Sequence, residues 1–213
     1  MNKGKIIFVS GTGTGIGKTI VSAILMEAWG AAYWKPVQAG IDGPTDTEIL
    51  RSLIGNPACR IFPETHLLEN PVSPHLAAQM ENKRISLDDF KIPETSSYLI
   101  IEGAGGLFSP LNDSQLNIDL IQKMGAEVVV VVKHYLGSIN HSLLSIEALK
   151  NRGIPMLGIV FNGVNDPSSE YVLNYTGVKN LLQIKEHEEI NKQLIREYAL
   201  QFLENTGNRL HEY

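Results

Sequence analysis

A glycine-rich segment that ends in Lys-Thr is the part of the chain best suited to chemistry. It reads Gly11-Thr12-Gly13-Thr14-Gly15-Ile16-Gly17-Lys18-Thr19. The apolar run Ile6–Val9 before it predicts a buried strand, and the apolar spacing of Ile20–Met26 after it predicts a helix. Between a strand and a helix N-terminus, backbone N–H groups converge where the helix dipole favours an anion. We therefore expect a nucleoside triphosphate to bind Gly13 through Thr19, with Lys18 on the outer phosphates and the Thr19 hydroxyl on Mg²⁺.

Two other interpretations of this loop have less support. The loop is one residue longer than the common phosphate-binding pattern and has Thr12 in place of the first glycine, so a chance Gly-Lys-Thr in a flexible turn is one alternative. The dinucleotide pattern G-x-G-x-x-G fails because Ile16 stands where the third glycine is needed. In addition Lys35, and not an acidic residue, ends the second predicted strand.

Polar residues also end other predicted strands, at the edge where parallel sheets bind ligands. They are Lys35, Glu102 and Asn162. Glu102, Asp46 and Thr19 together offer the hard oxygen ligands that Mg²⁺ prefers, while capping of its own helix is an alternative role for Asp46. Lys35 near Lys18 would concentrate positive charge, which suits a site that forms a new anion. The alternative for Lys35 is a surface lysine whose stem lies along the protein.

The remaining chemistry-bearing residues favour catalysis by positioning and electrostatics. Gly103–Gly106 exposes backbone N–H groups that would let an anion or a substrate approach closely, or else forms a flexible exit from the strand. The histidines are not spaced as metal ligands, and no G-x-S-x-G nucleophile motif is present. A covalent nucleophile is therefore not expected.

Strand-like runs alternate with helical patterns, which predicts a single α/β domain over residues 1–213. A mostly parallel β-sheet with helices on both faces is expected, because the all-valine run Val128–Val132 suits a strand covered on both sides. Thr45-Asp46-Thr47-Glu48 predicts a capped helix start, as does Ser73-Pro74, and the proline-rich stretch 56–74 predicts a loop over the active site. The predicted strands are Ile6–Ser10, Ala31–Lys35, Tyr98–Glu102, Glu127–Lys133, Met156–Asn162 and Leu181–Ile184.

Length and composition limit the classes of protein to which this chain can belong. The 213 residues are 43% hydrophobic and 19% charged, which is typical of a globular domain. The net charge of −5 argues against a nucleic-acid binder. No apolar stretch is long enough for a membrane span or a signal peptide, and the single cysteine, Cys59, permits no internal disulfide. We expect a soluble cytoplasmic protein.

Together these segments resemble the dethiobiotin synthetase family, which implies a P-loop NTPase-like fold and a homodimer. The resemblance runs from the phosphate-binding loop to about Tyr171, and it is specific because several short motifs occur in the same order. They are Gly11–Thr19, Trp34–Gly40, Asp46, Pro71–His75, Glu102–Leu111, Leu136–His141 and Asn162 with Glu170-Tyr171.

The resemblance implies an ATP-dependent ligase of biotin synthesis that uses Mg²⁺. The family converts 7,8-diaminononanoate and CO₂ to the cyclic urea dethiobiotin and releases ADP and phosphate. One amine captures CO₂ as a carbamate, ATP phosphorylates the carbamate, and the second amine displaces phosphate to close the ring. Lys18 and Lys35 would be the catalytic residues, because their charges lower the pKa of the amine and stabilise the carbamate anion.

The resemblance also assigns ligand contacts. Asn162 would read the adenine edge, and Thr19, Asp46 and Glu102 would hold Mg²⁺. The diamine would contact Thr14, Lys35, Ala39, Ser73, Gly105, Asn140 and Tyr171, with Asn140 and Tyr171 reaching across the dimer. Structural alternatives stay open for three of these: Asn140 as a helix N-cap, Ser73 as a helix cap and Tyr171 as a packing residue.

The chain departs from the family pattern at three places. Gly13 and Gly15 replace an acidic pair in the loop, and Ala39 replaces a hydroxyl residue before Gly40. Residues 182–185 read Leu-Gln-Ile-Lys instead of the family's Gly-Glu-Ile-Pro. Because that segment contributes to adenine recognition in the family, we expect looser selectivity among ATP, CTP and GTP.

Two rival functions share the phosphate-binding loop. A nucleotide-driven switch ATPase would typically carry a lysine at the place of Gly13, and its membrane-binding form would carry a basic C-terminal helix. The segment His187–Glu204 instead has four acidic and two basic residues. A small-molecule kinase would commonly carry an arginine-rich lid, and no such cluster is present. A kinase or a related amide ligase remains the nearer alternative.

Overall fold

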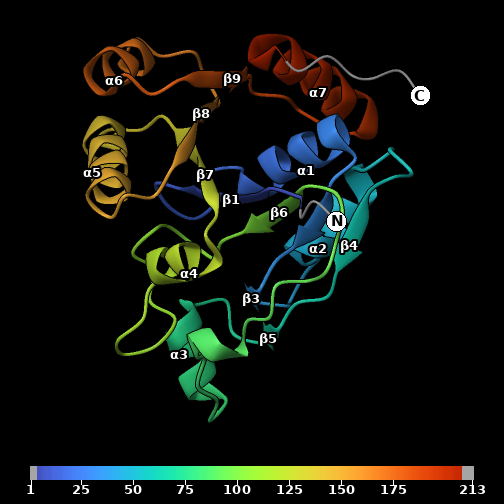
Figure 1. Cartoon of the computed structure of the whole chain (residues 1–213), viewed down its shortest axis with the longest axis vertical. Helices are drawn as coiled ribbons and strands as arrows, with labels where there is room; N and C mark the ends of the chain where they lie inside the picture. The colour runs from blue at the N-terminus through green and yellow to red at the C-terminus, as the bar shows by residue number, and fades with distance from the viewer. Residues whose placement is uncertain (1–3, 208–213) are drawn as a thin grey trace.

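The computed structural model describes residues 4–207, in which one sheet lies between two layers of helices (Figure 1). The sheet has seven strands in the order β4-β2-β6-β1-β7-β8-β9, and the paired neighbours run parallel. This confirms the predicted α/β class and sheet. The strands are β1 (Ile6–Gly11), β2 (Ala32–Trp34), β4 (Arg60–Phe62), β6 (Leu99–Glu102), β7 (Glu127–Lys133), β8 (Met156–Asn162) and β9 (Asn180–Ile184).

The helices divide between the two faces of the sheet (Figure 1). One face is covered by α1 (Lys18–Trp29), α2 (Asp46–Leu53) and α7 (Lys192–Thr206). The other is covered by α4 (Asn117–Met124), α5 (Ser138–Asn151) and α6 (Ser168–Thr176). Helix α3 (Pro74–Met80) packs instead against β3 (Val37–Ala39) and β5 (His66–Leu68), and a short 3₁₀ turn, η1, spans Leu87–Asp89. Between residues 4 and 207, no helix combines the length and apolarity that a membrane crossing requires.

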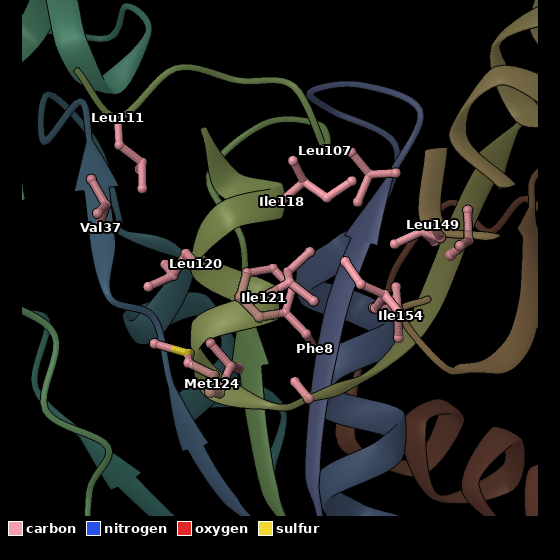
Figure 2. Close-up of a cluster of buried hydrophobic side chains, with 14 of the residues drawn as sticks. Phe8, Val37, Leu107, Leu111, Ile118, Leu120, Ile121, Met124, Leu149 and Ile154 are labelled. Atoms are coloured by element: carbon pink, nitrogen blue, oxygen red, sulfur yellow. The ribbon is translucent and has the colours of Figure 1, made fainter. Parts of the chain in front are cut away.

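Alternating side chains of the central strands point to opposite faces of the sheet and pack into two separate hydrophobic cores. In β1, Phe8 packs toward α4, and Ile7 and Val9 pack toward α1. Figure 2 shows Ile121 of α4 directed toward Phe8 within the first core. The valines of β7 are fully buried, as expected for a strand that is covered on both faces.

The prediction of an irregular loop across residues 56–74 was wrong in part. This stretch contains β4, which pairs with β2 at the sheet edge, and β5 (His66–Leu68), which pairs with β3 (Val37–Ala39) in a separate two-stranded sheet. Three-residue strands are too short to show an alternating pattern in the sequence. These segments form strands because they pair with strands elsewhere in the chain.

Both predicted helix starts lie where expected, but only one is capped by its side chain. Thr45 caps α2 with a full capping box, in which its side chain accepts from the Glu48 N–H and the Glu48 carboxylate accepts from the Thr45 N–H. Ser73 occupies the N-cap position of α3 and Pro74 follows at its first turn, yet the Ser73 hydroxyl makes no capping hydrogen bond. The predicted capping role of the Ser73 side chain is therefore wrong.

We predict that Cys59 reacts slowly with alkylating agents. Its thiol donates to the Met26 carbonyl at 3.2 Å, and burial, assisted by the charge of Glu27, raises its pKa to about 12. Because the thiolate is the reactive form, iodoacetamide labelling near pH 8 should be about 10³-fold slower than that of a free thiol with a pKa of about 8.5. If Cys59 in the folded protein were labelled as fast as free glutathione, the prediction would be contradicted. After unfolding in urea, Cys59 should be labelled at about the rate of glutathione.

Candidate active site

The phosphate-binding loop joins the end of β1 to the start of α1. Gly15 and Gly17 have φ values of 69° and 94°, a left-handed conformation that favours glycine. Lys18 is 7% exposed and folds back over the loop, where its Nζ donates to the Gly13 carbonyl at 2.7 Å. Burial lowers the pKa of Lys18 to about 8, partly offset by the negative charge of Glu102. The loop therefore already has the curvature that a phosphate cradle needs.

Asn162, at the end of β8, lies against this loop. Its Nδ2 donates to the Ile16 carbonyl at 2.9 Å. A Cβ atom on Gly17 would lie 2.2 Å from the same Nδ2, so a larger residue there would displace the amide from the loop. The residue predicted to read adenine thus also supports the phosphate-binding loop.

We predict that Gly17→Ala weakens ATP binding at least about tenfold. The substitution forces a left-handed alanine, at about 1–2 kcal/mol, and displaces Asn162 as well. Isothermal titration with a non-hydrolysable ATP analogue measures the effect. The matched control is Gly125→Ala at the end of α4, where φ is 60° and a Cβ would meet nothing within 4 Å. Equal ATP affinities in the two variants would show that the loop does not need Gly17.

A cluster of charged and hydroxyl groups lies beside the loop. Glu102, which is 1% exposed at the end of β6, accepts from Thr19 Oγ1 at 3.0 Å and from Lys35 Nζ at 2.9 Å, both through Oε1. Asp46, in the first turn of α2, has its Oδ1 3.0 Å from the same Thr19 hydroxyl, whose single proton the two carboxylates share, and pairs with Lys35 Nζ at 2.6 Å. Residues from α1, α2 and β6 thus meet Lys35, which lies between β2 and β3, at one point.

The charges in this cluster stabilise one another. Burial disfavours the ammonium of Lys35, which is 3% exposed, but Glu102 and Asp46 raise its pKa above the ordinary value. Burial likewise disfavours the carboxylate of Asp46, but Lys35 and the Thr19 hydrogen bond hold its pKa below the ordinary value. The alternative of a surface lysine at position 35 is therefore wrong, because its ammonium is buried between two carboxylates.

The donor set of this cluster fits Mg²⁺. The Thr19 hydroxyl touches one oxygen of Asp46 and one of Glu102, so three hard oxygen donors already converge. Within residues 4–207, this cluster included, no group of three or more His, Cys, Asp or Glu side chains is placed to hold a metal ion, so a metal here would rest on two carboxylates and one hydroxyl. Because Mg²⁺ at nucleotide sites takes one or two carboxylates and fills its other positions with water and phosphate, this small set is sufficient.

The glycine-rich exit of β6 packs against the phosphate-binding loop. A Cβ on Gly106 would lie 3.1 Å from the Gly11 carbonyl, and one on Gly105 would lie 3.9 Å from the Thr14 hydroxyl. Asn117 fastens this exit by donating to the Ala104 and Gly106 carbonyls at 2.5 and 3.0 Å. The predicted residues Thr14 and Gly105 are therefore neighbours in space.

Gln38 joins Ala39 to the carboxylate cluster. Its Nε2 donates to the carbonyls of Ala39 and Gly40 at 3.3 and 3.0 Å, and its Oε1 accepts from the Asp46 N–H at 3.4 Å. Ala39 ends β3 and is partly buried. The turn predicted to face the substrate is thereby held beside the start of α2.

Two predicted substrate contacts lie apart from the cluster within this chain. Asn140 is the third residue of α5, whose N-cap is Gly137, so the alternative of Asn140 as an N-cap is wrong. Tyr171, on α6, is 52% exposed and stacks on Tyr175 at 6.0 Å, so its ring packs on its own helix and not in the core, and the alternative of a packing residue stays open. In the described part of the chain, neither side chain forms a hydrogen bond with a residue of the cluster.

Sequence reasoning missed two residues that contact Glu102. Ser22 Oγ and Tyr33 Oη donate to Glu102 Oε2 at 3.1 and 3.0 Å. A signal was present: Ser22 lies three residues after Thr19 on the same helix face, and Tyr33 lies two residues before Lys35 on the same strand face. Without the position of β6, however, nothing indicated that both faces meet Glu102.

Comparisons with known proteins agree with this site. A family model described as an AAA domain matches residues 5–193. The chain is 44% identical over 199 residues to the ATP-dependent dethiobiotin synthetase BioD of Christiangramia forsetii, covering 93% of this chain and 96% of the relative. The chain belongs to the dethiobiotin synthetase family. The BioD proteins of Cytophaga hutchinsonii, at 45% identity over 94% and 98% of the two chains, and Rhodopseudomonas palustris, at 50% over 78% and 80%, are similar too.

Solved structures show the same fold at much lower identity. The ParA family ATPase of Chlorobium tepidum has a TM-score of 0.56 at 11% identity and covers 94% of this chain and 99% of its own. The cell division ATPase MinD of Pyrococcus furiosus has a TM-score of 0.54 at 15% identity, with the same coverage. This likeness establishes the P-loop ATPase fold. It does not support the switch function, because relatives at 44–50% identity are synthetases.

The segment that the resemblance relates to adenine recognition, residues 182–185, lies at the end of β9. The Gln183 amide donates to the Gly163 and Ile184 carbonyls at 3.1 and 3.2 Å, and the Lys185 N–H donates to the Tyr198 hydroxyl at 3.0 Å. These polar groups are therefore engaged within the protein. Looser nucleotide selectivity stays a prediction.

Proposed function

We propose that this chain acts as a single-domain, ATP-dependent dethiobiotin synthetase that closes 7,8-diaminononanoate and CO₂ into a cyclic urea. The observation that carries the proposal is the convergence of Lys35, Thr19, Asp46 and Glu102 beside the loop that carries Lys18. Membership of the family supports the same reaction. The buried positive charge of Lys35 suits a reaction whose first product is an anion.

The first step is capture of CO₂ by one amine of the substrate. An alkyl amine with a pKa of about 10.4 is neutral only about once in 10³ molecules at pH 7, and only the neutral form attacks CO₂. A new N–C bond forms and a proton leaves the nitrogen, which yields a carbamate. We assign to Lys18 and Lys35 the lowering of the amine pKa and the stabilisation of the carbamate oxygens.

The next two steps activate the carbamate and close the ring. A carbamate oxygen attacks the γ-phosphorus and ADP leaves. The second amine then attacks the carbonyl carbon, the C–O bond to phosphate breaks, and the attacking nitrogen gives up a proton, which leaves the neutral cyclic urea and phosphate. Backbone N–H groups from Gly13 to Thr19 and the ammonium of Lys18 would hold the phosphates in line. Thr19, Asp46 and Glu102 would hold Mg²⁺, which when bound neutralises charge on the phosphate oxygens.

We assign the remaining ligand contacts to the predicted residues. Asn162 would read adenine, and the carbamate end of the substrate would lie against Thr14, Lys35, Ala39, Ser73 and Gly105. Asn140 and Tyr171 would bind the distal carboxylate in the site of a second copy, which makes the functional unit a homodimer. Their exposure on α5 and α6, away from the cluster of their own chain, supports this arrangement.

The deciding experiment mixes the protein with 7,8-diaminononanoate, ¹³C-bicarbonate and Mg-ATP and follows the products by mass spectrometry. We expect a cyclic urea that carries one ¹³C atom, with ADP formed in equal amount. ADP formed without that urea would favour a kinase or an amide ligase with another acceptor. Omission of the diamine should abolish both products and serves as the control.

A further inference from the structure

The carboxylate of Glu102 has four hydrogen-bond donors, divided equally between its two oxygens. Lys35 donates to Oε1, and so does the Thr19 hydroxyl that is shared with Asp46; both are residues to which the proposed function gives ligand contacts. Ser22 and Tyr33 donate to Oε2, on the side of the core. Oε1 is thus contacted by residues of the proposed reaction site. Oε2 is held by Ser22 and Tyr33, which have no proposed contact with a ligand.

The ring of Tyr33 fills a space in the hydrophobic core, and this packing does not need the hydroxyl group. It is the middle residue of β2, is fully buried, and lies in the core between the sheet and α1. A phenylalanine would fill the same space, so the hydroxyl is the part that packing does not explain. A buried hydroxyl is costly without a partner, and its partner here is the charged oxygen of Glu102 at 3.0 Å.

Ser22, on α1, is the second donor to Glu102 Oε2. It lies one turn after Thr19 and is fully buried, so the same face of α1 donates to both oxygens of Glu102. With donors from a helix and from the neighbouring strand, the carboxylate plane has a single orientation. Loss of either donor on Oε2 leaves the carboxylate free to turn toward the remaining one.

We propose that Tyr33, assisted by Ser22, is a positioning residue of the reaction: its hydroxyl fixes Glu102 so that Oε1 faces Thr19 and Lys35. This inference rests on the proposed function, because it assigns Glu102 Oε1 to the metal side of the site. Such supporting hydrogen bonds behind a metal ligand are typically worth 10- to 100-fold in metal affinity or activity.

The test compares Tyr33→Phe with Tyr198→Phe. Tyr198 is 8% exposed and its hydroxyl also has partners, but these are Lys185 and His187 and not a carboxylate of the cluster. Mn²⁺ is titrated into each protein at saturating ADP, so that a change in ADP affinity caused by the Tyr198–Lys185 contact does not alter the occupancy, and free Mn²⁺ is followed by electron paramagnetic resonance. We expect the Mn²⁺ dissociation constant to rise at least about tenfold in Tyr33→Phe and to stay unchanged in Tyr198→Phe.

A kinetic measurement separates positioning from a structural role. In Tyr33→Phe the Mg²⁺ concentration for half-maximal dethiobiotin formation should rise by a similar factor, while turnover at saturating Mg²⁺ falls less. If Tyr33→Phe does not fold, Ser22→Ala takes its place with the same expected shifts, because Ser22 donates to the same oxygen.

Equal Mn²⁺ constants in Tyr33→Phe, Tyr198→Phe and the unmodified protein would overturn the proposal, as would equal losses in both variants. The Mn²⁺ measurement needs no turnover. Absence of the cyclic urea with the unmodified protein would therefore contradict the proposed function without deciding the role of Tyr33.

Discussion

Replacing Lys35 with glutamine is expected to lower the turnover of dethiobiotin formation by about 10²-fold or more, the scale for loss of one preorganised charged donor. Lys35 is 3% exposed and its ammonium lies between Glu102 and Asp46 at 2.9 and 2.6 Å, so its charge acts with little screening by water. Glutamine keeps a hydrogen-bond donor but removes that charge. The measurement is the steady-state rate of cyclic urea formation at saturating substrates.

The affinity for ATP should change far less than the turnover in Lys35→Gln. Lys18 and the loop N–H groups are the expected phosphate ligands, and Lys35 contacts neither in this structure. The control is Lys83→Gln, which removes an exposed lysine whose one ion-pair partner among residues 4–207 is Glu81. Turnover of Lys35→Gln within twofold of the unmodified protein would remove Lys35 from the mechanism.

Replacing Glu102 with glutamine is expected to affect both rate and stability. The substitution removes one acidic partner of buried Lys35, and breaking a buried ion pair costs about 3–5 kcal/mol. Asp46 still pairs with Lys35 and the amide keeps the shape of the side chain, so we expect about 3 kcal/mol. Urea denaturation without metal or nucleotide measures this loss.

The rate effect of Glu102→Gln should be at least about 10²-fold at ordinary Mg²⁺ concentrations, because a neutral amide is a poor metal ligand. The control is Asp88→Asn in the Lys123–Asp88 pair, in which the Asp88 side chain is 93% exposed. An exposed pair contributes little, so this variant should unfold at the same urea concentration as the unmodified protein. Equal stability of the two variants would show that Glu102 is not part of a stabilising buried network.

The strength of a local pattern decided how well each part of the fold was predicted. The strands Glu127–Lys133 and Met156–Asn162 have the bounds expected from their apolar runs. The capping box at Thr45 was equally legible, because its residues interact within one turn. The strands Arg60–Phe62 and His66–Leu68 were missed, since three residues carry too little periodicity and depend on pairing with distant segments.

By itself, the sequence determined that the chain has a phosphate-binding loop between a strand and a helix, that its sheet is covered on both faces, and that it resembles one family of ligases. These properties depend on residues close together in the chain. Only the tertiary structure decided that Lys35 is buried between two carboxylates and that Ser22 and Tyr33 hold the far oxygen of Glu102. These partners are brought together by the order of β2, β6 and β1 in the sheet and by the seating of α1 across them. Strand order is set by long-range packing, which no local pattern encodes.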